Sequence, residues 1–107
     1  MKSRNAEPLE GDPLDTTTGA SAELHDARAE ITEIDRRVVA LLGERVQVGR
    51  RARVAKEREG RPMLDPAREA VVIRQASAQA RDLGLDTEAV RKVFWGIVEM
   101  TREASDG

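Results

Sequence analysis

The sequence predicts an all-α protein with one very long N-terminal helix followed by two shorter helices. Two observations predict this fold class. Aromatic residues are nearly absent, with one Phe and one Trp among 107 residues, while Ala, Val, Leu, Arg and Glu dominate, a composition typical of helical proteins. From Leu24 onward, apolar residues also recur at alternating steps of three and four, which is the spacing of one helix face.

Residues 1–20 are expected to form a disordered tail, and residues 21–105 a single helical domain. The segment EPLEGDPLDTTTGAS mixes Pro, Gly, Thr and Asp without any period. Its few apolar residues cannot offset the entropy that the chain would lose on ordering. The length of the chain allows one domain at most.

The long helix is expected to run from about residue 22 to residue 59. Its apolar stripe, interrupted only by Arg45, consists of Leu24, Ala27, Ile31, Ile34, Val38, Leu41, Val48, Ala52 and Ala55. At 1.5 Å per residue this helix would be about 55 Å long, which exceeds the diameter of a small domain. Because the rest of the chain is too short to cover such a stripe, a second copy of the chain is expected to cover it in a homodimer.

Turn signals separate the first helix from the second. Gly60 suits the position after a helix, and Pro62 prevents continuation. Asp65 then suits the N-cap of a second helix, with Pro66 at its first position.

The second helix is expected to end near Gly84, and Asp86 or Thr87 to cap a third. The apolar face of the third helix follows helical spacing and consists of Val90, Val93, Phe94, Ile97, Val98 and Thr101.

Several classes of function are disfavoured by composition. There is no cysteine, and His25 is a single histidine without companions, so neither a metal site nor a cofactor is expected. The longest purely apolar run covers residues 38–42, far short of the roughly 20 residues of a membrane span. Without an apolar signal region, the expected location is the cytoplasm.

Nucleic-acid binding is not expected either. Residues 45–61 contain seven basic and two acidic residues, but the whole chain has a formal net charge of −2. No aromatic residues are interleaved for base stacking.

Arg45 stands where the stripe predicts an apolar side chain. An unpaired buried charge is costly, so Arg45 is expected to form an interhelical ion pair or to extend its head to solvent along its aliphatic stem. Lys56 lies eleven residues later, which is about three turns plus 20°, so it shares the face of Arg45 roughly 16 Å along the axis.

Further polar residues are predicted near this face. The turn at Gly60 brings the start of the second helix back toward Lys56, and presents Asp65, Arg68 and Glu69 within about one turn. These three residues also suit a cap and two solvated surface charges. Arg28 is about 100° out of phase with Arg45, so it would reach such a site only in the partner of a dimer.

Two stretches resemble the all-helical chorismate mutase family of the AroQ type, which forms intertwined homodimers. They are ARAEITEIDRRVVALLGERVQVGRRARVAKEREGRPMLDPARE and, more weakly, VFWGIVEMT. The resemblance covers residues 22–104. The residues that match the family's polar site positions without a gap are Arg28, Arg45, Lys56, Asp65, Arg68 and Glu69.

The resemblance implies roles for these residues. Arg45, together with Arg28 of the other chain, would hold the two carboxylates of the substrate, and Lys56 would donate to its ether oxygen. Glu69 with the Asp65 region would accept the ring hydroxyl. Arg68 would assist the ring carboxylate, near a small hydroxyl residue at Thr101.

The implied reaction is the isomerisation of chorismate to prephenate, a Claisen rearrangement in the shikimate pathway to aromatic amino acids. It requires no nucleophile, metal or obligatory proton transfer. It requires the flexible enolpyruvyl arm to be folded over the ring, and cations where negative charge develops. A site of this kind, shared between two chains, would bind a small dicarboxylate.

The family usually has Gln or Glu late in the third helix, as a second donor to the ether oxygen. Gapless alignment places Ser105 there, which is too short to reach that oxygen without a bridging water. Three alternatives stay open: a 4-amino-4-deoxychorismate mutase, an isochorismate pyruvate lyase on the same fold, and a non-catalytic helical dimer that serves as a binding or regulatory module. A complex with another enzyme of the pathway stays open too.

Overall fold

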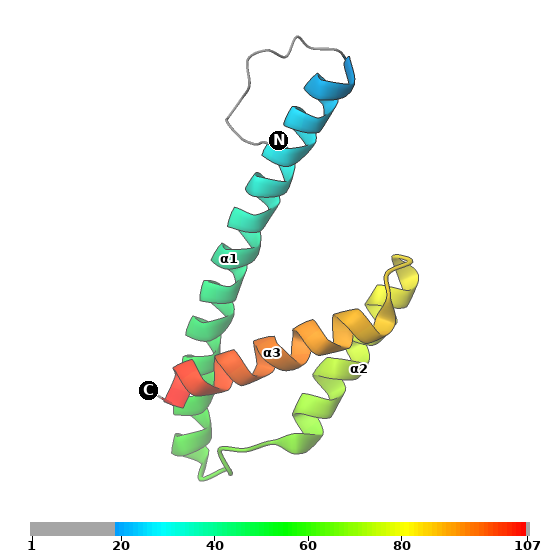
Figure 1. Cartoon of the computed structure of the whole chain (residues 1–107). Coiled ribbons are helices and arrows are strands. Elements are labelled where there is room, and N and C mark those ends of the chain that lie inside the picture. The colour runs from blue at the N-terminus through cyan, green and yellow to red at the C-terminus, as the bar shows by residue number, and fades with distance from the viewer. Residues whose placement is uncertain (1–18, 107) are drawn as a thin grey trace. The chain divides into compact units, whose positions relative to one another are not determined.

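The computed structural model describes residues 19–106, and the side chains of residues 19–105. Within this range the chain is all-α and contains no strand. The helices are α1 (Gly19–Glu59), α2 (Pro66–Asp82) and α3 (Thr87–Asp106) (Figure 1). The predicted fold class, with one long helix and two shorter ones, is confirmed. The predicted tail lies outside the described residues except for its last two, which already belong to α1.

The chain divides into two compact units, one ending at Val38 and the other beginning at Val39. In the first unit, every described residue is exposed. Its large apolar residues, Leu24, Ile31, Ile34 and Val38, are between 46% and 56% exposed. This half of the predicted stripe is therefore uncovered in the single chain.

The second unit contains the small core of the molecule. Helices α2 and α3 lie side by side in it, joined by the turn at Gly84 (Figure 1). The buried apolar residues are Ile73, Ala76 and Ala80 of α2, at helical spacing, and Val98 of α3.

Glycines end α1 and α2 as the sequence predicts. Gly60 has φ 67° and Gly84 has φ 72°. Glycine adopts this left-handed conformation without the steric cost of a Cβ atom. Both chain reversals therefore depend on a residue without a side chain.

Aspartates cap the two shorter helices. Asp65 Oδ1 accepts a hydrogen bond of 3.0 Å from the Arg68 amide, and Pro66 occupies the first helical turn. Asp86 Oδ1 accepts an equivalent 3.0 Å bond from the Ala89 amide, so Asp86 rather than Thr87 caps α3.

The C-terminal end of α3 lies against α1 at Gly49. A Cβ atom on Gly49 would lie 2.8 Å from both Ser105 Oγ and Thr101 Cγ2. Two arginines of α1 bind the last turn of α3: Arg50 Nε donates to Ala104 O at 3.3 Å, and Arg53 Nη1 donates to Ser105 O at 2.9 Å. These bonds satisfy carbonyls that a helix end leaves open.

Candidate functional site

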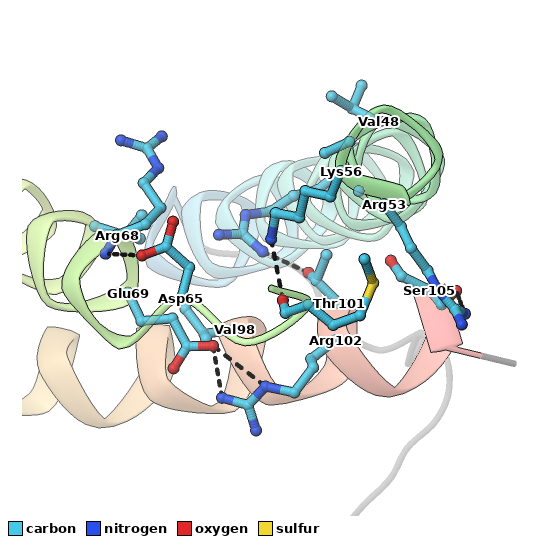
Figure 2. A pocket seen from close by; sticks show the side chains of 15 residues that line it. Val48, Arg53, Lys56, Asp65, Arg68, Glu69, Val98, Thr101, Arg102 and Ser105 are labelled. Atoms are coloured by element: carbon cyan, nitrogen blue, oxygen red, sulfur yellow. Dashed lines mark hydrogen bonds and ion pairs between the residues drawn. The ribbon is translucent and has the colours of Figure 1, made fainter. Parts of the chain in front are cut away.

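The second unit contains a pocket of about 380 Å³ where α1, the start of α2 and the end of α3 meet (Figure 2). This volume is within the range of about 300–1,000 Å³ that is usual for small-ligand sites. The charged residues among its fifteen lining residues are Arg45, Arg53, Lys56, Asp65, Arg68, Glu69 and Arg102. Five cations against two carboxylates favour a small anionic ligand.

Seven of the eight site residues expected from the sequence line this pocket: Arg45, Lys56, Asp65, Arg68, Glu69, Thr101 and Ser105. Six of them belong to α1, α2 or α3, and Asp65 caps α2. The turn at Gly60 and the crossing at Gly49 bring them together. The eighth, Arg28, belongs to the first unit and is exposed. Arg28 is not one of the residues that line the pocket.

Arg45 is held by the third helix. Its Nη1 donates a hydrogen bond to Thr101 Oγ1, and the Thr101 hydroxyl donates in turn to Ile97 O at 2.8 Å. Burial, and to a smaller extent repulsion from the positive charge of Arg68, lower the pKa of the Arg45 guanidinium. An anion bound near both guanidiniums would relieve this repulsion.

Lys56 presents its ammonium group to the same pocket. Its Nζ donates to Met63 O at 3.1 Å (Figure 2). Since an ammonium group has three donors, two remain for a ligand. Arg45 and Lys56 thus line one pocket from one helix, as their spacing predicts.

Asp65 and Arg68 stand at the start of α2. The Asp65 carboxylate caps the helix through the Arg68 amide, so its expected structural role is confirmed. The Arg68 side chain is exposed and points away from the Glu69 carboxylate (Figure 2). Its guanidinium makes no hydrogen bond within residues 19–105 and has its donors open to a ligand.

Glu69 is bound by a residue that the sequence interpretation missed. Arg102 donates from Nε and from Nη2 to a single oxygen, Glu69 Oε2, at 3.2 and 2.7 Å (Figure 2). One signal could have identified Arg102. Arg102 lies four residues after Val98 and therefore on the apolar face of α3. It is a charged residue on an apolar face, as Arg45 is on α1.

Arg53 is the second cation that sequence interpretation missed. It lines the pocket, donates to Ser105 O and lies 3.7 Å from Glu57 Oε2 through its Nε. Eight residues separate it from Arg45, which places it about 80° away around the helix. Its place in the site follows from the crossing of α1 and α3, which the spacing does not reveal.

The Ser105 hydroxyl is buried, and its oxygen has no hydrogen-bond partner in the described part of the chain. Ser105 also lines the pocket. A buried hydroxyl without a partner is unfavourable, because it has lost the hydrogen bonds that it makes to water in the unfolded chain. The hydrogen-bonding capacity of this hydroxyl is therefore unused in the described part of the chain.

Neither a metal cluster nor a spanning segment occurs in the described range. Among residues 19–106 no group of three or more His, Cys, Asp and Glu side chains is arranged to hold a metal ion. None of the three helices combines the length and the apolar character needed to cross a membrane.

Comparison with known proteins identifies the family. The family model described as chorismate mutase type II matches residues 27–105, which include all of α2 and nearly all of α3. A search of curated proteins finds no match.

Proposed function

The chain belongs to the chorismate mutase type II family, and we propose that it catalyses the rearrangement of chorismate to prephenate without a cofactor. In this family the reaction is a step of the shikimate pathway. The observation that carries the proposal is that Arg45, Lys56 and Arg68 line one pocket with an excess of positive charge.

The reaction demands little chemistry from side chains and much positioning. Chorismate is a dicarboxylate whose enolpyruvyl arm must fold over its ring before the C–O bond breaks and the new C–C bond forms. Gripping both carboxylates in the bent shape removes rotational freedom before the reaction, an effect that supplies up to several kcal/mol. Arg45 and Arg68 are the cations proposed for this grip.

Lys56 is proposed to stabilise the transition state. Negative charge develops on the ether oxygen as the C–O bond breaks, and an ammonium donor already in place needs no reorganisation. By comparison with other preorganised donors to developing oxyanions, this contribution is about 3–4 kcal/mol. The remaining hydrogens of Lys56 suit this role.

The ring hydroxyl is proposed to bind Glu69, with Asp65 beside it. Glu69 Oε1 accepts no hydrogen bond within residues 19–105, since both bonds from Arg102 end on Oε2. The unpartnered Ser105 hydroxyl is proposed to hold a water that donates to the ether oxygen, in place of the longer side chain usual in the family.

A second copy of the chain is proposed to complete the site, in an intertwined homodimer. The apolar stripe of α1 is uncovered not only before Val38 but also at Leu41 and Val48, which are 59% and 52% exposed. A stripe of this length requires a partner helix. Arg28 of the partner would then contribute the further cation for a substrate carboxylate.

The test is an assay of the purified protein with chorismate, isochorismate and 4-amino-4-deoxychorismate in turn, following loss of the ring diene absorbance. We expect turnover of chorismate to prephenate, and a fall in kcat of at least about 100-fold in Lys56→Ala. Lys92→Ala, on the exposed surface of α3, serves as the matched control and should keep wild-type turnover. Full activity in Lys56→Ala would refute the role of this lysine.

A further inference from the structure

The ion pair between Arg102 and Glu69 bears on which substrate the pocket accepts. Resting on the proposed function, we propose that Arg102 is a specificity-determining residue, which neutralises Glu69 so that the site selects a ring hydroxyl over a ring ammonium. Arg102 acts through Glu69 and positions it, so no contact between Arg102 and the substrate is required.

The geometry of the pair leaves one carboxylate oxygen for a ligand. Both donors of Arg102 end on Glu69 Oε2, at 3.2 and 2.7 Å, and both residues line the pocket. The side chains are 37% and 23% exposed, so solvent screens the pair only in part. Oε1 keeps the ability to accept a hydrogen bond, which is all that a hydroxyl donor requires.

An ammonium group requires more than an acceptor, because its charge must be compensated when it leaves water. The negative charge of Glu69 is already offset by Arg102. Asp65, the other carboxylate of the pocket, caps α2 through the Arg68 amide, where the positive end of the helix offsets its charge. Neither carboxylate therefore has an uncompensated charge for an ammonium group.

The remaining charges of the pocket also disfavour a ring ammonium. Arg45, Arg53, Lys56 and Arg68 line it as well, so a cationic substituent would be repelled from several sides. Removal of Arg102 would release the negative charge of Glu69. Substitution of Arg102 should consequently change the selectivity between a ring hydroxyl and a ring ammonium more than it changes the overall affinity for the substrate.

The experiment measures kcat/KM for chorismate and for 4-amino-4-deoxychorismate, and takes their ratio. We expect the wild type to favour the hydroxyl acid by at least about tenfold, and Arg102→Met to reduce this ratio by at least about tenfold. Arg102→Lys, which keeps the charge, should stay within about threefold of the wild-type ratio. Arg91→Met, which removes another arginine of α3 from an ion pair with Glu88, is the matched control and should leave the ratio unchanged.

A double substitution separates electrostatics from structure. In the Glu69→Gln background there is no charge left to neutralise, so Arg102→Met should no longer change the ratio. If Arg102 merely joins α2 to α3, its removal would lower thermal stability and leave the ratio unaltered in both backgrounds. An unaltered ratio would overturn the proposal. An equal loss of turnover of both acids would overturn it too, because Arg102 would then hold a substrate carboxylate.

Failure of the proposed function has a different signature. If the wild type turns over neither acid, the proposed reaction is refuted, and the same ratio is then read from the dissociation constants of the two acids by calorimetry. A binding ratio that shifts in Arg102→Met and not in Arg102→Lys would still support the role of Arg102. Binding of neither acid would overturn both proposals.

Discussion

The guanidinium of Arg45 donates a hydrogen bond to the hydroxyl of Thr101, which lies 56 residues later in the chain and on a different helix. Thr101 is held in turn by its own bond to Ile97 O. The direction of the cation on α1 is thus set by α3. The third helix therefore takes part in the site although it carries few of its charges.

Replacing Thr101 by Val removes this acceptor while nearly preserving shape. A hydrogen bond to a charged group contributes about 1.5–3 kcal/mol, so we expect kcat/KM for chorismate to fall by at least about tenfold, because Arg45 is less well placed. Thr101→Ser keeps the hydroxyl and should stay close to the wild type. A loss in Thr101→Ser without a loss in Thr101→Val would show that the methyl group matters rather than the hydrogen bond.

Gly49 should not tolerate a side chain. Its Cβ atom would lie 2.8 Å from Ser105 Oγ and Thr101 Cγ2, so Gly49→Ala must displace the end of α3. We expect a loss of about 1–2 kcal/mol in the free energy of unfolding.

The matched control for this substitution is Gly43→Ala, in the same helix, whose Cβ would meet no atom within 4 Å. It should gain about 0.5–1 kcal/mol from helix propensity. Urea unfolding at one fixed protein concentration measures both variants. If both gain stability alike, α1 and α3 do not approach each other as closely as described.

Arg45→Leu should separate stability from function. The pKa of Arg45 is lowered by burial and by Arg68, which means that the charged form is disfavoured in the folded state. At every pH below that lowered pKa, neutral pH included, the charge therefore costs folding free energy. We expect a melting temperature at or above that of the wild type, with kcat/KM reduced at least about 100-fold.

Arg74→Leu, on the exposed face of α2, is the control for Arg45→Leu and should retain activity. A marked fall in the melting temperature of Arg45→Leu would mean that Arg45 stabilises the free protein, contrary to the repulsion described.

A longer donor at position 105 should raise the rate. Ser105→Gln would extend an amide into the pocket, toward the place where the family has its second donor, and we expect kcat to rise about tenfold. Ser105→Ala removes the hydroxyl and should lower kcat by a few-fold at most. Single-turnover kinetics distinguish this gain from faster product release. A lower kcat in Ser105→Gln would mean that α3 meets the pocket in a different register.

Shared sites can be tested by mixing two inactive variants. Arg28→Ala and Lys56→Ala would each disable every site of a homodimer, but in a mixed dimer one of the two sites would contain both native residues. Random mixing after co-refolding should therefore restore about a quarter of the wild-type activity. Recovery of none, with mixed dimers present by native mass spectrometry, would exclude the contribution of Arg28 to the partner's site.

Local signals in the sequence were sufficient to predict the helices. The apolar spacing of α1, the left-handed glycines at 60 and 84 and the aspartate caps each act within a few residues, and the structure confirms them. Only the start of α1 differs, at Gly19 instead of about residue 22. The common face of Arg45 and Lys56 was predictable for the same reason, since both residues belong to one helix.

The contacts between helices were not predictable in this way. The pairing of Arg102 with Glu69 depends on how α2 and α3 are aligned, and the bond from Arg53 to Ser105 O depends on where α3 ends against α1. Periodicity fixes which residues share a face, but not which residue of another helix lies opposite. The charge balance of the pocket therefore became apparent only in three dimensions.

The close approach at Gly49 also has an evolutionary consequence. Because Thr101 and Ser105 occupy the space above this glycine, substitutions at the three positions are constrained as a group. A homologue with a larger residue at the position of Gly49 should have compensated with smaller side chains on the third helix, and the three columns of a deep alignment should covary. Directed evolution of the pocket to accept a bulkier acid would meet the same constraint, because the effect of a substitution at one of these three positions would depend on the residues at the other two.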